Sequence, residues 1–211
     1  MRYFTFQPEG VDNCEVTAHI QTSGASPEMK ERKIPAVVIC PGGGYNMVSD
    51  REAEPVAKEY FAAGYQVFVL TYSVGSRSKN FEPLCQLAAT VAHIRKYAEE
   101  LGVDKEKIAV CGFSAGAHLA GSLGTLYNED KFLQVWKREE EIRPNAMILC
   151  YPVILANEYA HKGSIKNVSG SEAGTEEYQW FSLDNRFLPS QNLQHLPNHP
   201  MYLTVSHPSQ K

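Results

Sequence analysis

The chain has 211 residues, of which 43% are hydrophobic and 21% charged, and its formal net charge is −4. This length and composition favour one globular domain over residues 1–211 and argue against intrinsic disorder. The charge excludes a strongly basic nucleic-acid or anionic-membrane binder, and no apolar stretch approaches the roughly 20 residues that cross a bilayer.

The cysteines and the N-terminus indicate a reducing compartment. Of the five cysteines, Cys40, Cys111 and Cys150 each end an apolar run, where a small buried thiol fits. No Cys-x-x-Cys pair or histidine cluster suggests a metal site. Residues 1–5 lack the apolar core of a signal peptide. We therefore expect a cytoplasmic protein that binds no metal and no cofactor.

The first half of the chain predicts strands and helices in alternation. Four strands are expected, the last two buried because they are mainly apolar: residues 2–6, 14–21, 34–40 and 65–72. Asp50 is predicted to cap a helix that runs to about Ala63 and that Gly64 closes. A second helix is predicted over residues 83–101, with Gly102 at its end.

The second half continues the alternation. The expected elements are a strand at 108–111, a helix at 114–127, a solvent-facing helix at 128–143 and strands at 146–151 and 201–205. In the third of these elements, Phe132, Val135 and Trp136 should share one side. Strands that alternate with helices predict a mostly parallel α/β sheet with helices on both faces.

Residues 152–197 form a long, polar and weakly patterned connection. Connections of this length are usually functional or mobile. We expect a lid or substrate cap there.

The most informative motif is Gly112-Phe113-Ser114-Ala115-Gly116, between the strand at 108–111 and the helix after it. A Gly-x-Ser-x-Gly turn in this context raises the serine hydroxyl above the sheet. The glycines leave room for the strand and helix that approach the turn. Ser114 is therefore the candidate nucleophile, and a serine that merely caps a helix is the alternative.

A second motif, Gly42-Gly43-Gly44, follows the strand at 34–40. Glycines allow backbone amides to face a substrate, as in the oxyanion loop of lipases and esterases. The amides of Gly43, Gly44 and Ala115 are the candidate oxyanion donors. A flexible turn or a phosphate-binding loop is the alternative, although the Lys-Ser/Thr of a P-loop is missing.

These motifs together resemble the α/β-hydrolase esterases, in particular the bacterial acetyl-xylan-esterase-like and feruloyl-esterase-like branch related to the hormone-sensitive-lipase group. The resemblance covers about residues 30–155 and rests on these segments: Pro41-Gly42-Gly43-Gly44-Tyr45, Asp50-Arg51-Glu52, Gly64-Tyr65, Tyr72-Ser73-Val74, and Gly112 to Ala120. One departure is Ala117, where relatives often have glycine.

The resemblance implies a cofactor-independent hydrolase of small acyl or sugar esters with a Ser…Asp…His triad. Ser114 carries over, but the acid and base do not, because they would follow the strand at 201–205 and the sequence reaches only Lys211. We expect a truncated or frameshifted member that lacks the final strand and helix, with little activity and with association through an exposed sheet edge.

Local residues are the remaining candidates for the acid and base. Asp184 followed by His199 or His207 has the right chain order, and His207 is preferred because it follows a strand. His118 should point away from the Ser114 hydroxyl and pack or bond locally. The alternatives to an esterase are a non-catalytic binding protein of the same fold and an amide or peptide hydrolase.

Overall fold

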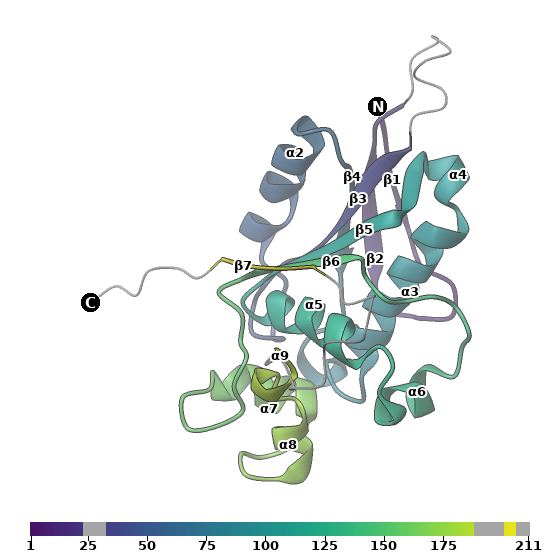
Figure 1. Cartoon of the computed structure of the whole chain (residues 1–211). Helices are drawn as coiled ribbons and strands as arrows, with labels where there is room; N and C mark the ends of the chain where they lie inside the picture. The colour runs from purple at the N-terminus through teal and green to yellow at the C-terminus, as the bar shows by residue number, and fades with distance from the viewer. Residues whose placement is uncertain (23–32, 188–200, 206–211) are drawn as a thin grey trace.

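Seven strands form one mixed sheet in the computed structural model, which describes residues 1–22, 33–187 and 201–205 (Figure 1). The strands are β1 (Arg2–Phe6), β2 (Glu15–Ile20), β3 (Ile34–Cys40), β4 (Gln66–Thr71), β5 (Val103–Phe113), β6 (Ala146–Cys150) and β7 (Met201–Val205). Their order across the sheet is β1-β2-β4-β3-β5-β6-β7. The predicted strands are confirmed, and β5 is longer than expected.

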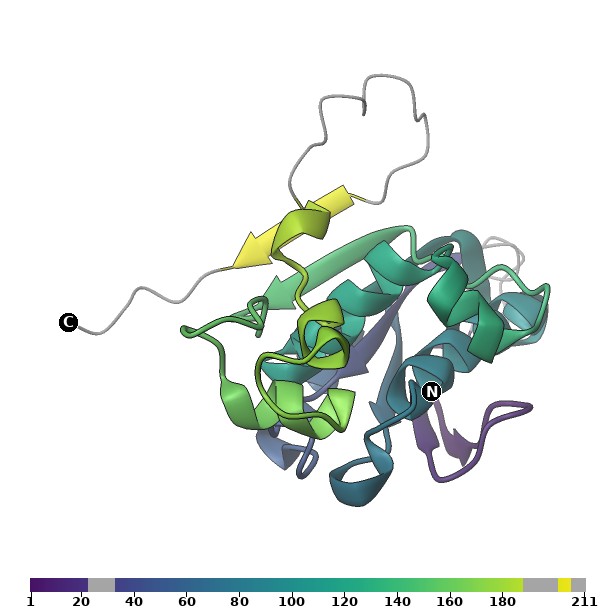
Figure 2. The same ribbon diagram turned by 90° about the horizontal axis from the view of Figure 1, so that it is seen from below.

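The sheet is parallel from β4 to β7 and antiparallel at the β1–β2–β4 side. Figure 2 shows β7 beside β6 at one edge and the β1–β2 pair at the other. The register pairs Cys40 with Gly112, so β3 and β5 end at the same level. The loops that follow these two strands are therefore neighbours.

Helices cover both faces of the sheet, as predicted. Side chains of β3 alternate between the two cores because successive residues of a strand point to opposite faces. Val37 and Ile39 pack with α2 (Glu54–Ala62) in the smaller core. Ala36 and Val38 belong to the larger core, which α3 (Glu82–Lys96) and α5 (Ala115–Leu126) cover.

Two helix boundaries differ from the prediction. Asp50 does not cap the helix: it begins a separate 3-10 turn, η1 (Asp50–Glu52), and α2 starts after Ala53 with a proline in its first turn. A proline near a helix start is favoured because its missing N–H would have no intrahelical acceptor. The helix predicted over 83–101 is divided at Tyr97 into α3 and α4 (Ala98–Leu101), and Gly102, at φ 65°, ends it as expected.

The prediction of a helix over residues 128–143 is wrong beyond its first half. The observed helix is α6 (Asp130–Trp136), which ends because Lys137 adopts a left-handed conformation with φ 50°. Phe132 and Trp136 are buried, whereas Val135 is 44% exposed. A further 3-10 turn, η2 (Gly75–Arg77), lies between β4 and α3.

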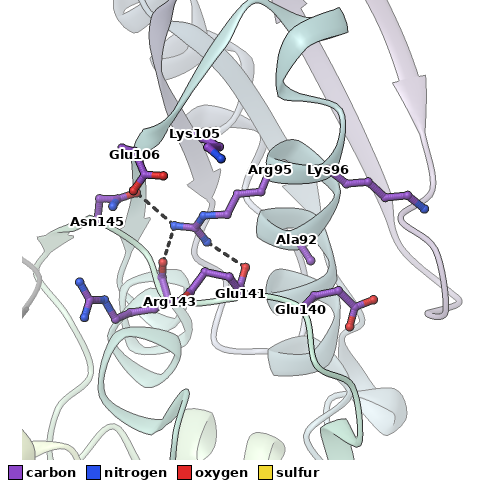
Figure 3. A pocket seen from close by; sticks show the side chains of 9 residues that line it. All are labelled: Ala92, Arg95, Lys96, Lys105, Glu106, Glu140, Glu141, Arg143 and Asn145. Atoms are coloured by element: carbon purple, nitrogen blue, oxygen red, sulfur yellow. Dashed lines mark hydrogen bonds between the residues drawn. The ribbon is translucent and has the colours of Figure 1, made fainter.

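The irregular stretch after α6 is held in place by Arg95 of α3. The Arg95 guanidinium donates to the carbonyls of Glu141 and Arg143, at 2.9 and 2.6 Å, and to Asn145 Oδ1 at 3.1 Å (Figure 3). Asn145 Oδ1 also accepts from the Ile108 amide of β5. The cavity around Arg95, of about 620 Å³, lies near the start of β5 and therefore far from the end where Ser114 follows.

Residues 152–187 carry three short helices, α7 (Lys162–Ser169), α8 (Glu176–Trp180) and α9 (Asp184–Phe187). Their apolar residues Ile165, Val168, Tyr178 and Phe181 join the larger core. The described part of the predicted lid is thus packed against the domain, and the rest of 152–197 lies outside the described residues. No described helix combines the length and hydropathy of a bilayer-spanning segment.

A buried histidine joins this segment to the sheet. His118 of α5 is fully buried; its Nδ1 lies 2.8 Å from the Tyr45 hydroxyl and its Nε2 lies 2.8 Å from the Phe181 carbonyl. A carbonyl only accepts, so Nε2 carries the proton and Nδ1 accepts from Tyr45. The expectation that His118 packs in the interior is confirmed, but its side-chain hydrogen-bond partners are distant in sequence and not local.

We predict that the Arg95 contacts stabilise the domain. Arg95→Met should lower the free energy of unfolding by about 1–3 kcal/mol, because the partly buried Arg143 carbonyl and Asn145 Oδ1 lose their donor. Urea denaturation measures this change. The neighbouring Lys96→Met variant is the control: it removes an exposed ion pair with Glu9 and a cation–π contact with Tyr97, and it should leave the urea midpoint almost unchanged. Equal midpoints for the two variants would contradict the role of Arg95.

We predict that His118 makes the domain acid-sensitive. Burial lowers its pKa from 6.5 to about 4, so between these values the unfolded chain binds a proton that the folded chain does not. The free energy of unfolding should therefore fall as pH drops from 6.5 toward 4, by up to about 1.4 kcal/mol per pH unit. Denaturation at several pH values should show a shallower slope in His118→Gln. An unchanged slope would exclude His118 as the cause.

Candidate active site

Ser114 occupies a strained turn between β5 and α5. Its backbone has φ 53° and ψ −115°, a conformation that a residue with a side chain rarely adopts. The Ser114 amide donates to the Cys150 carbonyl of β6 at 3.0 Å, and the Ser114 carbonyl accepts from His118 and Val153. These bonds hold the strained residue from both sides.

The two glycines of the elbow are required by close backbone contacts. A Cβ atom on Gly112 would lie 2.2 Å from the Gly116 carbonyl oxygen, and one on Gly116 would lie 2.0 Å from the Cys40 carbonyl oxygen. Contacts this short do not occur, so any larger residue would displace backbone. The steric reason predicted for these glycines is confirmed, and for Gly116 the neighbour is the end of β3.

The glycine loop after β3 is fixed, and two of its amides have no acceptor among the described residues. Gly43, at φ 129°, could not carry a side chain, since its Cβ would lie 2.2 Å from the Met47 carbonyl oxygen. The Gly44 carbonyl accepts from Asn167 of α7 at 2.9 Å. Within residues 1–22, 33–187 and 201–205, the amides of Gly43 and Gly44 have no hydrogen-bond partner, whereas the Gly42 amide donates to Glu52.

Ser114, Gly43 and Gly44 line one cavity of about 500 Å³. Ala115 opens α5, so its amide has no acceptor in the preceding turn. The structure thus brings together the four residues predicted as nucleophile and oxyanion donors. Most of the remaining lining side chains are polar: Asn46, Ser49, Arg51, Glu52, Tyr151, His161 and Asn167.

Glu52 connects the loops on either side of Ser114. Its Oε2 accepts from the Gly42 amide and its Oε1 from the Tyr151 hydroxyl, both at 2.7 Å. Burial, followed by the Glu52 contact, raises the pKa of the Tyr151 hydroxyl above its usual range, so this group stays protonated. Sequence reasoning included Glu52 in a motif but assigned it no role, and it missed Tyr151.

His161 is a third lining residue to which the sequence assigned no role. It precedes α7 and lines the Ser114 cavity from the side of Gly44. It is the single histidine among the described residues that line this cavity. The available signal was its position in the polar segment predicted as a cap, but the sequence shows no pattern that would select it.

Of the candidate acid and bases, only Asp184 belongs to the described residues, and it does not line this cavity. Asp184 lies at the start of α9, does not line the cavity, and has one buried carboxylate oxygen without a partner in the described part of the chain. His207 and His199 lie outside the described residues. Across the residues that the structure describes, no cluster of three or more His, Cys, Asp or Glu side chains could hold a metal ion.

Comparison with known proteins agrees with this geometry. The chain is 34% identical over 153 residues to endo-1,4-beta-xylanase B of Butyrivibrio fibrisolvens, covering 71% of this chain and 24% of that protein. It is 30% identical to an acetylxylan esterase of Xylanibacter ruminicola, covering 65% of this chain and 26% of that protein. The chain thus spans about a quarter of these relatives.

A solved structure shares the fold. The α/β hydrolase MGS-M1, from a Medee basin deep-sea metagenome library, is 37% identical, with a TM-score of 0.64 over 76% of this chain and 60% of that one. The family model BD-FAE matches residues 25–185. From the elbow, the strand order and this match, the chain belongs to the BD-FAE family and has the α/β-hydrolase fold, as its motifs suggested.

Proposed function

We propose that the chain is the serine-bearing domain of a carboxylic-ester hydrolase that forms an acyl-enzyme on Ser114. The observation that supports this most is the strained Ser114, which shares its cavity with the amides of Gly43 and Gly44, unpaired within the described ranges. A buried serine cap would need neither the strain nor the unpaired donors. Preorganised donors of this kind are worth roughly 10²–10³ in rate each.

The proposed reaction begins with attack by Ser114 Oγ on the ester carbonyl carbon, while a base removes the hydroxyl proton. The amides of Gly43, Gly44 and Ala115 stabilise the resulting oxyanion. When the tetrahedral intermediate collapses, the C–O bond to the alcohol breaks, and the protonated base returns its proton to that alcohol. In the second half, the base removes a proton from water, whose oxygen attacks the acyl carbonyl carbon. The bond to Ser114 Oγ then breaks, the base returns the proton to Oγ, and the carboxylic acid leaves.

The base in this proposal lies outside the described residues. Among the sequence candidates, His207 falls there, and Asp184 would have to act with it. A serine without its base retains only the roughly 10³–10⁴-fold acceleration that binding and the oxyanion donors supply. The second candidate function is a non-catalytic binding protein of the same fold, and it is favoured because neither candidate, Asp184 or His207, is among the described residues that line the Ser114 cavity. An amide or peptide hydrolase remains a further alternative on this scaffold.

The proposed substrates are acetyl or other small acyl esters of sugars. The cavity over Ser114 is lined mainly by amide, hydroxyl and charged side chains, which suit a hydroxylated alcohol better than a long acyl chain. The acetylxylan esterase to which the chain is similar supports the same substrate class. A small-molecule ester is thus the proposed partner of this site.

We predict that a fluorophosphonate probe labels Ser114 and that p-nitrophenyl acetate is hydrolysed. Ser114→Ala should abolish both, with a loss of about 10⁶-fold in turnover when the base is in place. Mass spectrometry of the labelled peptide and an absorbance assay measure the two effects. Ser122→Ala, a buried serine on the same helix, is the control and should retain both. A folded wild-type chain that is neither labelled nor active would favour the non-catalytic alternative.

We predict that Glu52 is a positioning residue for the oxyanion loop. Glu52→Ala should slow fluorophosphonate labelling by about 10²-fold, because the Gly42 amide and the loop that follows lose their anchor. Glu52→Gln should lose less, since its amide oxygen still accepts from Gly42. Asp50→Asn, two positions earlier and exposed, is the matched control. Wild-type labelling of folded Glu52→Ala would contradict this role.

A further inference from the structure

His161 stands over the oxyanion loop. A Cβ atom built on Gly44 would lie 3.9 Å from His161 Cε1 and 3.6 Å from Ser164 Oγ. The imidazole edge is therefore close to the glycine whose amide is a proposed oxyanion donor. Nε2, which is bonded to Cε1, belongs to this same edge of the ring.

The helix that carries His161 is held rigidly. Asn167, near the other end of α7, donates to the Gly44 carbonyl at 2.9 Å, and the Asn167 carbonyl accepts from Ser78 Oγ at 2.8 Å. Between these ends, Ile165 and Val168 are buried in the larger core. Both ends of α7 thus lie against Gly44, so His161 has a fixed position relative to Ser114.

The contacts of His161 determine which ring nitrogen carries the proton. Nδ1 lies 2.8 Å from Ser164 Oγ and accepts from the Ser164 amide at 3.3 Å. The same amide also donates to the His161 carbonyl at 3.0 Å. An amide N–H cannot accept a hydrogen bond, so Nδ1 keeps its lone pair. In the neutral ring the proton is then on Nε2.

This tautomer presents a donor and not a base. Within the described residues, Nε2 has no hydrogen-bond partner. A general base needs a lone pair directed at the serine hydroxyl. In His161 the ring lone pair is on Nδ1, where it accepts from the Ser164 amide and caps α7. The other nitrogen, Nε2, can donate its N–H to a ligand in the cavity.

We propose that His161 determines substrate specificity by donating from Nε2–H to a hydroxyl oxygen on the alcohol part of the ester, where that alcohol is a sugar. This inference rests on the proposed function. The scissile carbonyl oxygen already has backbone amides as donors, and an acetyl methyl group accepts no hydrogen bond. The hydroxyls of the alcohol are therefore the acceptors that remain for a donor beside Gly44.

The test needs variants that separate two roles of His161: capping α7 through Nδ1 and donating a hydrogen bond from Nε2. Asparagine is among the best N-cap residues, so His161→Asn retains the cap of α7 while withdrawing the donor. In His161→Asn, KM for acetylated xylobiose should rise about three- to tenfold, the loss of one hydrogen bond, with kcat little changed. Hydrolysis of p-nitrophenyl acetate, whose alcohol has no sugar hydroxyl, should be unaffected, and so should the melting temperature. His161→Ala should show the same KM effect together with a lower melting temperature.

A second measurement does not require turnover. Nitrogen NMR of isotope-labelled histidine in the Ser114→Ala protein should show a lone pair on Nδ1 and a proton on Nε2. Acetylated xylobiose should shift the Nε2 signal, and it should bind about three- to tenfold more weakly when His161→Asn is added.

Each outcome is decisive for His161. A fall of 10⁴-fold or more in kcat and in labelling for His161→Asn would identify it as the base and overturn the proposal. An equal loss of kcat/KM for acetylated xylobiose and p-nitrophenyl acetate would also overturn it. So would a proton on Nδ1, or a Ser114→Ala protein that does not bind acetylated xylobiose. A wild-type chain without turnover contradicts the proposed function alone, because the NMR experiment still decides the role of His161.

Discussion

The close approach of α5 to the end of β3 is the contact on which the rest of the site depends. Gly116 lies so near the Cys40 and Pro41 carbonyls that a Cβ atom would be 2.0 and 2.4 Å from their oxygens. This contact brings the first turn of α5 and the loop after β3 to one place. It also forces Ser114 into its strained conformation, because the chain must reverse within one residue to enter the helix. Ser114 and the proposed oxyanion donors are neighbours for this steric reason.

A second layer of contacts keeps the glycine loop from relaxing. Glu52 binds it at Gly42, Tyr72 at the Pro41 carbonyl, His118 at Tyr45 and Asn167 at the Gly44 carbonyl. These anchors come from η1, the residue that follows β4, α5 and α7, so the surrounding elements fix a loop of flexible residues. The arrangement leaves the Gly43 and Gly44 amides unpaired among the described residues. Donors that are already oriented stabilise a developing charge without reorganisation.

The segment after β6 serves the site and the core together. Ile165, Val168, Tyr178 and Phe181 pack into the larger core, and the Phe181 carbonyl accepts from the buried His118. As a result, His161 and Asn167 reach the cavity from a firmly packed helix. Precise placement of polar side chains over a reactive serine requires this kind of support. The proposed sugar contact of His161 depends on it.

The sequence by itself determined the strands, the elbow at Ser114 and the glycine loop. Each of these depends on short-range effects: apolar periodicity, and glycines where backbone approaches backbone. It misplaced the extent of α6 because the residues after Trp136 follow contacts made elsewhere, such as the bonds of Arg95 to Glu141 and Arg143. It also misplaced the start of α2, because Asp50 begins a separate 3-10 turn. Only the tertiary structure decided which side chains face Ser114. Glu52 and Tyr151 are 99 positions apart and His118 and Phe181 are 63 apart, so no local pattern could pair them, and their roles arise from the packing of distant loops around one turn.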